Sequence, residues 1–137
     1  MDIYSSRKRS FIMSKISGKE TKPEIKVRKY LFALGFRYRK NVSTLPGKPD
    51  IVLPKYKTVI FINGCFWHGH DCKAAKLPTT RTEFWSDKIS ANRERDNRTY
   101  QTLEAIGWKI LVVWQCAIRN KQLFEAEMER VVLFLKQ

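Results

Sequence analysis

Acidic residues are scarce in this chain of 137 residues, in which 13 Asp and Glu stand against 27 Lys and Arg and leave a net charge of +14. The basic excess is concentrated in residues 1–50. Such a balance in a small, aromatic-rich protein suggests a polyanionic partner, most often nucleic acid. Solubility alone or association with ribosomes would produce the same charge, so charge does not choose between these interpretations.

Long hydrophobic runs are also missing. No apolar stretch reaches the length that a membrane-spanning helix needs, and residues 1–12 lack the apolar segment of a secretory signal. Repeats, linkers and low-complexity segments are absent, while 43% hydrophobic and 29% charged residues are typical of a folded protein. We therefore expect a cytoplasmic protein with no membrane partner, made of a basic flexible arm at 1–12 and a single domain at 13–137.

Cysteine is rare, and its odd number of three argues against a disulfide framework. Both histidines and two of the cysteines fall within residues 65–72. Three thiolates and one imidazole form the ligand set of a closed, structural Zn²⁺ site, although the spacing is not that of a common zinc finger. Three small buried thiols with an incidental histidine are the alternative. The predicted zinc ligands are Cys65, His70, Cys72 and Cys116.

The hydrophobic pattern predicts an α/β fold with a mixed central sheet flanked by helices. Thr21 and Glu24 form a plausible capping box, and the inward stripe of the first helix is Val27, Leu31 and Leu34. Expected helices are 21–34, 82–105 with a possible break at Ser90, and 122–135. Expected strands are 37–41, a hairpin of 50–53 and 58–62, and a buried strand at 108–114.

Polar residues at the ends of the predicted hairpin point to phosphodiester chemistry. Asp50 begins the first strand, Asn63 follows the second, and Glu24 faces inward from the first helix. A carboxylate and a backbone carbonyl suit Mg²⁺, and His68, which the zinc assignment leaves free, could take a proton from water. Against this interpretation, the second strand lacks the acid-x-Lys of many nucleases, Pro-Asp is common in turns, and His68 could instead compete with His70 for zinc.

Aromatic residues cluster beside the same octapeptide. Phe66 and Trp67 lie within it, and Trp85 follows in the next helix. Large apolar side chains are usually core residues, but in a basic protein they could wedge between base pairs, which costs least at a mismatch.

Several longer motifs resemble the very-short-patch repair (Vsr) DNA mismatch endonucleases. The resemblance spans about residues 13–116 and is most specific in the segments Gly64-Cys65-Phe66-Trp67-His68 and Thr82-Glu83-Phe84-Trp85. It implies a restriction-endonuclease-like fold and a Mg²⁺-dependent enzyme that nicks one strand on the 5′ side of the thymine in a T:G mismatch. Such mismatches arise when 5-methylcytosine deaminates. A monomer acting on double-stranded DNA, with mismatch-repair proteins as further partners, is the expectation.

The resemblance also implies roles for individual residues. Asp50 and the backbone carbonyl of Ile62 would bind Mg²⁺, with Glu24 near the metal-bound water, and His68 would be the catalytic histidine. The zinc ligands would be the four residues named above, and the DNA-intercalating set would be Phe66, Trp67 and Trp85, with Met13 on a minor-groove arm. The chain departs from the family at Asn63, where some members have a second active-site histidine, because Asn carries no proton at neutral pH. A nuclease of the same fold with another specificity, and a zinc-stabilised nucleic-acid-binding module, remain as alternatives.

Overall fold

The structure is a computed structural model that describes residues 22–40, 42–70, 72 and 76–137. The predicted basic arm, Met13 and the capping residue Thr21 lie outside the described residues. Within these ranges, no helix combines the length and the apolar character required to cross a membrane.

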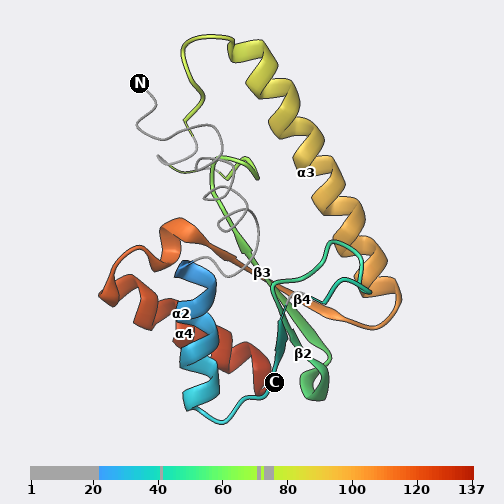
Figure 1. Cartoon of the computed structure of the whole chain (residues 1–137), viewed down its shortest axis with the longest axis vertical. Helices are drawn as coiled ribbons and strands as arrows, with labels where there is room; N and C mark the ends of the chain where they lie inside the picture. Colours follow the sequence, from blue (N-terminus) through green and yellow to red (C-terminus); the bar gives the residue numbers. More distant parts are fainter. Residues whose placement is uncertain (1–21, 41, 71, 73–75) are drawn as a thin grey trace, which may run out of the picture.

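A four-stranded mixed sheet forms the centre of the molecule (Figure 1). Its strands are β1 (Arg39–Lys40), β2 (Ile51–Leu53), β3 (Thr58–Asn63) and β4 (Lys109–Trp114), in that spatial order. The predicted hairpin is confirmed: β2 and β3 pair antiparallel, with Ile51 opposite Ile60. β3 and β4 pair in parallel, and such a pair needs a long crossover, which the helix between them supplies.

Helices cover both faces of this sheet, as the sequence predicts. α2 (Lys22–Ala33) and α4 (Lys121–Leu135) lie close together on one face, whereas α3 (Thr82–Ala105) runs along the other face and extends beyond it (Figure 1). The β3 strand shows how one sequence serves both layers. Ile60 packs into the α2–α4 core, and Val59 and Phe61 pack into a smaller cluster with Leu103 of α3, as the two-residue period of a strand requires.

Three details of the sequence-based prediction are wrong. α3 runs unbroken through Ser90, because Ser90 is exposed and residues 82–105 contain no glycine or proline to interrupt the helix. Leu34 does not join the buried stripe of Val27 and Leu31; it is 54% exposed, since it follows the end of α2 at the turn made by Gly35.

The third error concerns the last strand, which was expected to be buried throughout. Only Leu111 and Val113 are buried, on the α2–α4 side, while the alternate residues are half-buried or exposed. Val112 and Trp114 therefore face the layer of α3, where they border a pocket.

The final helix begins at Lys121, one residue earlier than predicted, because the Asn120 side chain caps it by accepting from the Leu123 N–H at 2.9 Å.

Candidate active site

Asp50 lies at the edge of the sheet, immediately before β2. Its Oδ2 accepts a hydrogen bond of 2.7 Å from the backbone N–H of Ile62 on β3. The N–H and C=O of one strand residue point to the same side of the strand, so the Ile62 carbonyl also faces the side on which Asp50 lies. Glu24 of α2 is 1% exposed and approaches the carboxyl group of Asp50. Arg28 Nη1 lies 3.8 Å from Oε1 of Glu24.

Burial dominates the electrostatics of this carboxyl group. It raises the pKa of Asp50 to about 7; the hydrogen bond from Ile62 opposes the shift, and the neighbouring Glu24 increases it through charge and a hydrogen bond. Two carboxyl groups held together away from water resist ionising together. A divalent cation relieves that repulsion, and carboxylate and carbonyl oxygens are the ligands that Mg²⁺ prefers. The donor set of Asp50, Ile62 and Glu24 thus suits Mg²⁺.

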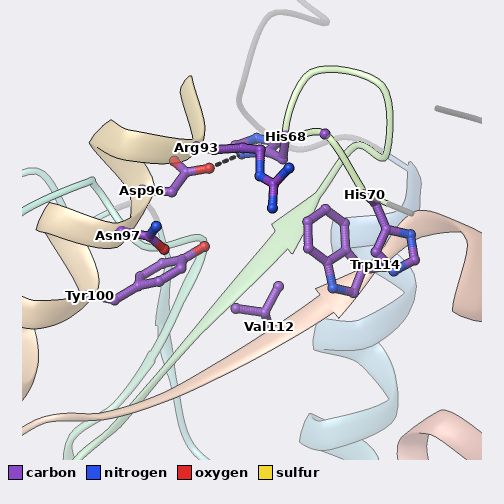
Figure 2. Close-up of a pocket in the computed structure, with 9 residues that line it drawn as sticks. His68, His70, Arg93, Asp96, Asn97, Tyr100, Val112 and Trp114 are labelled. Carbon is purple, nitrogen blue, oxygen red and sulfur yellow. Dashed lines mark hydrogen bonds and ion pairs between the residues drawn. The ribbon is translucent and has the colours of Figure 1, made fainter. Parts of the chain in front are cut away.

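His68 forms a dyad with an acid on α3. Its Nδ1 lies 2.5 Å from Oδ2 of Asp96 (Figure 2), and both side chains are partly exposed. A carboxylate at Nδ1 favours the tautomer with the proton on that nitrogen, which leaves Nε2 able to accept a proton. His68 stands outside the cysteine cluster, so the idea that it competes with His70 as a metal ligand has no support in this geometry.

An open pocket of about 360 Å³ lies beside the dyad (Figure 2). Tyr100 connects it with the Asp50 site, because its hydroxyl accepts a hydrogen bond of 3.1 Å from Asn63 Nδ2. Burial raises the pKa of Tyr100, and the charges of Asp96 and Asp50 raise it further, so this hydroxyl lies within electrostatic reach of both acids. The pocket is lined by His68, Gly69, His70, Arg93, Asp96, Asn97, Tyr100, Val112 and Trp114.

The contribution of α3 to this pocket was missed at the level of the sequence. Arg93, Asp96, Asn97 and Tyr100 recur at intervals of three and four residues, so they occupy one face of the helix. The same periodicity could have identified them as one polar face of the helix, but not the segment that this face meets, which is the loop that carries His68 and His70 (the histidine loop).

The three cysteines and His70 come together as predicted, at the junction of the loop after β3 with the 3₁₀ turn after β4 (Gln115–Ile118). Their ligand atoms all lie within 4.8 Å of one another, and Cys116 Sγ is 3.5 Å from His70 Nδ1. A zinc tetrahedron has edges of about 3.5 to 3.8 Å, given Zn–S of about 2.3 Å, so the cluster could hold such an ion.

An aromatic neighbour and burial both affect this cluster. The His70 ring stacks on Trp114, with ring centroids 4.1 Å apart. Burial raises the pKa of the Cys116 thiol to about 11, and Cys65 and Cys72 beside it add to the shift. Three thiols this close ionise together only if a cation compensates their charge.

Phe66, Trp67 and Trp85 form an aromatic cluster with centroid distances of 5.2 to 5.8 Å, and Phe84 extends it at 5.1 Å from Trp85. Trp67 and Phe84 are 49% and 45% exposed, so this is no ordinary core. Phe84 was not assigned this place from the sequence. Cations border the rings: Lys88 Nζ is 5.6 Å from the centroid of Trp67, and the Arg81 guanidinium is 4.4 Å from that of Phe84.

The known proteins that this chain resembles belong to one group of DNA endonucleases. Residues 1–74 match the family described as DNA mismatch endonuclease Vsr. The type II nicking enzyme V.NmeAIP of Neisseria meningitidis is 53% identical over 98% of this chain and 96% of its own length. V.XorIIP of Xanthomonas oryzae, also named a type II nicking enzyme, is 43% identical over 96% of both chains.

The DNA mismatch endonuclease Vsr of Escherichia coli is 42% identical over 88% of this chain and 78% of its own length. The two segments that carry the resemblance most specifically, residues 64–68 and 82–85, meet in the aromatic cluster, and His68 of the first segment also lines the pocket. The fold class is therefore the restriction-endonuclease-like one that the sequence predicted, and the chain belongs to the Vsr family of DNA mismatch endonucleases.

Proposed function

We propose that this protein nicks one strand of double-stranded DNA on the 5′ side of the thymine in a T:G mismatch, in very-short-patch repair. The observation that carries the proposal is the His68–Asp96 dyad. It borders the pocket, and His68 directly follows the aromatic pair Phe66–Trp67, of which Trp67 is exposed. Residues 13–137 form the nuclease domain in this proposal, and residues 1–12 form a basic arm on the DNA.

The histidine dyad supplies the base. Nε2 of His68 takes a proton from water as the water oxygen attacks phosphorus. The bond from phosphorus to the 3′ oxygen breaks, which leaves a 5′ phosphate and a 3′ oxygen that takes a proton from solvent to become a hydroxyl. Asp96 holds the ring through Nδ1 and stabilises the imidazolium that results. Asn63 takes no proton; its amide donates to Tyr100 and so helps to fix that hydroxyl at the pocket wall.

Mg²⁺ is the proposed catalytic cofactor; the Asp50 carboxylate and the Ile62 carbonyl would hold it, and Glu24 would lie near its water ligands. When bound, the ion supplies Lewis-acid stabilisation of charge on the phosphate and on the leaving oxygen. The chain's own contribution is orientation. The Ile62 N–H donates to Oδ2 of Asp50, which fixes this carboxylate beside the backbone of Ile62.

Recognition is assigned to the aromatic cluster. Phe66, Trp67 and Trp85 would enter between base pairs at the mismatch, where unstacking is least costly, with Met13 reaching the minor groove. Lys88 beside the rings suits the nearby backbone phosphates. Zn²⁺ on the four-residue cluster would be structural and would hold the loop that carries both the aromatic pair and His68.

The direct test is single-turnover nicking with Mg²⁺ on end-labelled duplexes that carry either one T:G mismatch or the matched T:A pair. We expect one nick 5′ of the mismatched thymine and none in the matched duplex. Asp50→Ala should abolish the nick and retain binding. Binding of the T:G duplex without cleavage at any Mg²⁺ or Mn²⁺ concentration would refute the proposed nuclease activity and favour a DNA-binding module without catalysis.

A second candidate is a nicking enzyme of the same fold with a different specificity, which the type II nicking enzyme names of two relatives favour. Trp67→Ala separates the two. If the rings read the mismatch, this substitution reduces nicking of T:G duplex far more than any residual nicking of matched duplex. An equal reduction on both substrates would favour the second candidate.

A further inference from the structure

Arg93 of α3 lines the pocket beside the histidine dyad and extends toward its centre, between Asp96 and Trp114 (Figure 2). Its side chain is exposed. Asp96 pairs with His68, and Arg95 Nη2 lies 3.8 Å from its Oδ1. Among the residues that the structure describes, no ion pair or hydrogen bond engages the Arg93 guanidinium, so its N–H donors are available to a ligand in the pocket.

Gly69 fixes the position of this arginine. It has a φ of +64°, and a Cβ at this residue would lie 2.7 Å from Cδ of Arg93 and 2.6 Å from Cγ2 of Ile89. The loop can therefore press against α3 only because residue 69 has no side chain. The close contact holds the aliphatic stem of Arg93 and leaves the guanidinium free to point into the pocket.

Two further donors follow on the same helix face. Asn97 and Tyr100 line the pocket one and two turns after Arg93. The Tyr100 oxygen already accepts from Asn63, so its own O–H can donate elsewhere. The acids of the site are Asp50, Glu24 and Asp96, and a phosphate that enters brings more negative charge. Among the described residues that line the pocket, Arg93 carries the permanent positive charge, since His68 is charged only when protonated.

We propose that Arg93 binds the non-bridging oxygens of the phosphate that is cut, with the Tyr100 hydroxyl as a second donor. The planar fork of arginine matches two phosphate oxygens. The guanidinium thus compensates charge that grows on those oxygens as water attacks. This inference rests on the proposed nuclease function and adds to it a substrate-binding residue on α3.

Arg93→Met tests the assignment, because methionine retains an apolar stem against Gly69 and loses the charge. We expect single-turnover nicking of the T:G duplex to fall about ten- to a hundredfold, the usual effect of losing a charge-assisted contact. Arg93→Lys should recover only part of the rate, since lysine lacks the fork. Arg98→Met is the matched control: it removes an exposed charge from the same helix outside the pocket lining and should change the rate only a few fold.

The contacted phosphate can be located with duplexes that carry one neutral methylphosphonate at successive linkages, with binding measured without Mg²⁺. Neutralising the scissile linkage should weaken binding by the native protein and by Arg98→Met, but should have little further effect on Arg93→Met. An undiminished effect in Arg93→Met, or coupling to another linkage, would overturn the assignment.

The two proposals fail differently. If the native protein nicks the T:G duplex and folded Arg93→Met nicks it equally fast, the arginine assignment alone is wrong. If the native protein nicks no duplex, the nuclease proposal is wrong and the role of Arg93 in phosphate binding falls with it. Thermal unfolding of each variant, which should match that of the native protein, verifies that a lost rate reflects the site.

Discussion

The two faces of the sheet differ in what holds them together. Among the residues that the structure describes, 13 buried ones form one continuous hydrophobic cluster on the α2–α4 face. The buried cluster on the α3 face contains four described residues, and α3 itself buries only Ile89 and Leu103 of its 24 residues. One face thus supplies most of the hydrophobic stabilisation, while the other presents polar and aromatic side chains and carries the site.

The α3 face compensates for its thin core with polar links. Asn92 of α3 donates to the Trp67 carbonyl at 2.9 Å, His68 bonds to Asp96, and the cysteine cluster joins the same loop to the end of β4. Because few buried contacts hold the loop, its position depends on these links. Substitutions on the α3 face should therefore lower activity more than stability, and substitutions on the α2–α4 face should do the opposite. The predictions below run from loss of both activity and stability to a change of stability with pH.

Loss of metal from the cysteine cluster should have the largest effect. Structural zinc contributes on the order of 10 kcal/mol to the folding of small domains. We expect Cys116→Ser, or chelator treatment, to release zinc, abolish nicking and lower the melting temperature steeply. Metal analysis after dialysis provides the measurement. A fully folded protein that never contained metal would contradict the zinc assignment.

Removal of the His68 imidazole should slow nicking and leave the free energy of unfolding nearly unchanged. His68→Ala should slow single-turnover nicking by about 10² to 10⁴-fold, the usual contribution of general base catalysis. Asp96→Asn should slow it less, because the ring remains but its preferred tautomer is lost. Urea unfolding should show free energies of unfolding close to the native value for both variants. A His68→Ala variant with native rates would remove His68 from the mechanism.

A cavity in the α2–α4 core should lower stability and leave the nicking rate unchanged. Met128 of α4 is completely buried, and Met128→Ala should cost about 2 to 5 kcal/mol of unfolding free energy. The nicking rate per folded molecule should stay near native, since Met128 belongs to the core on the far side of the sheet from the pocket. Leu133→Ala is the matched control: its side chain is 65% exposed on the same helix, so its loss should be nearly neutral. A large loss of rate per folded molecule in Met128→Ala would show that the two faces are coupled.

The smallest expected effect is the pH dependence of stability. Folding raises the pKa of Asp50 from 3.8 to about 7, so the folded state binds this proton more tightly than the unfolded chain does. Stability from this group is complete below about pH 4 and declines as the pH rises to about 7, at about 1.4 kcal/mol per pKa unit at most. Glu24 and Arg28 face the same carboxyl group and modify the shift in opposite directions.

Urea unfolding of the Mg²⁺-free protein across this range should therefore show a downward slope that Asp50→Asn lacks. Adding Mg²⁺ near pH 7 should restore stability to the native protein and not to the variant. Identical pH profiles for the two proteins would show that Asp50 is not held in the protonated state as its burial implies.

Much of the fold was predictable because it rests on local patterns. Two short apolar runs on either side of residues 54–57 identified the β2–β3 hairpin, and Val27 and Leu31 marked the buried side of α2. The errors occurred where neighbouring segments decide the outcome. Leu34 fits the helical period but lies beyond the end of α2, and the apolar run of β4 gave no sign that α3 would leave Trp114 partly exposed.

The sequence by itself determined the types of chemistry available: a scarce set of cysteines and histidines concentrated in one loop, an acid before a hairpin, and a strong positive charge. Tertiary structure alone decided which of these groups meet. Asp96, Tyr100 and Arg93 are ordinary residues of a polar helix until the parallel pairing of β3 and β4 places α3 over the histidine loop. The physical reason is that hydrogen bonding and charge compensation act over a few ångströms, and those distances are set by packing between segments about 30 residues apart in the chain.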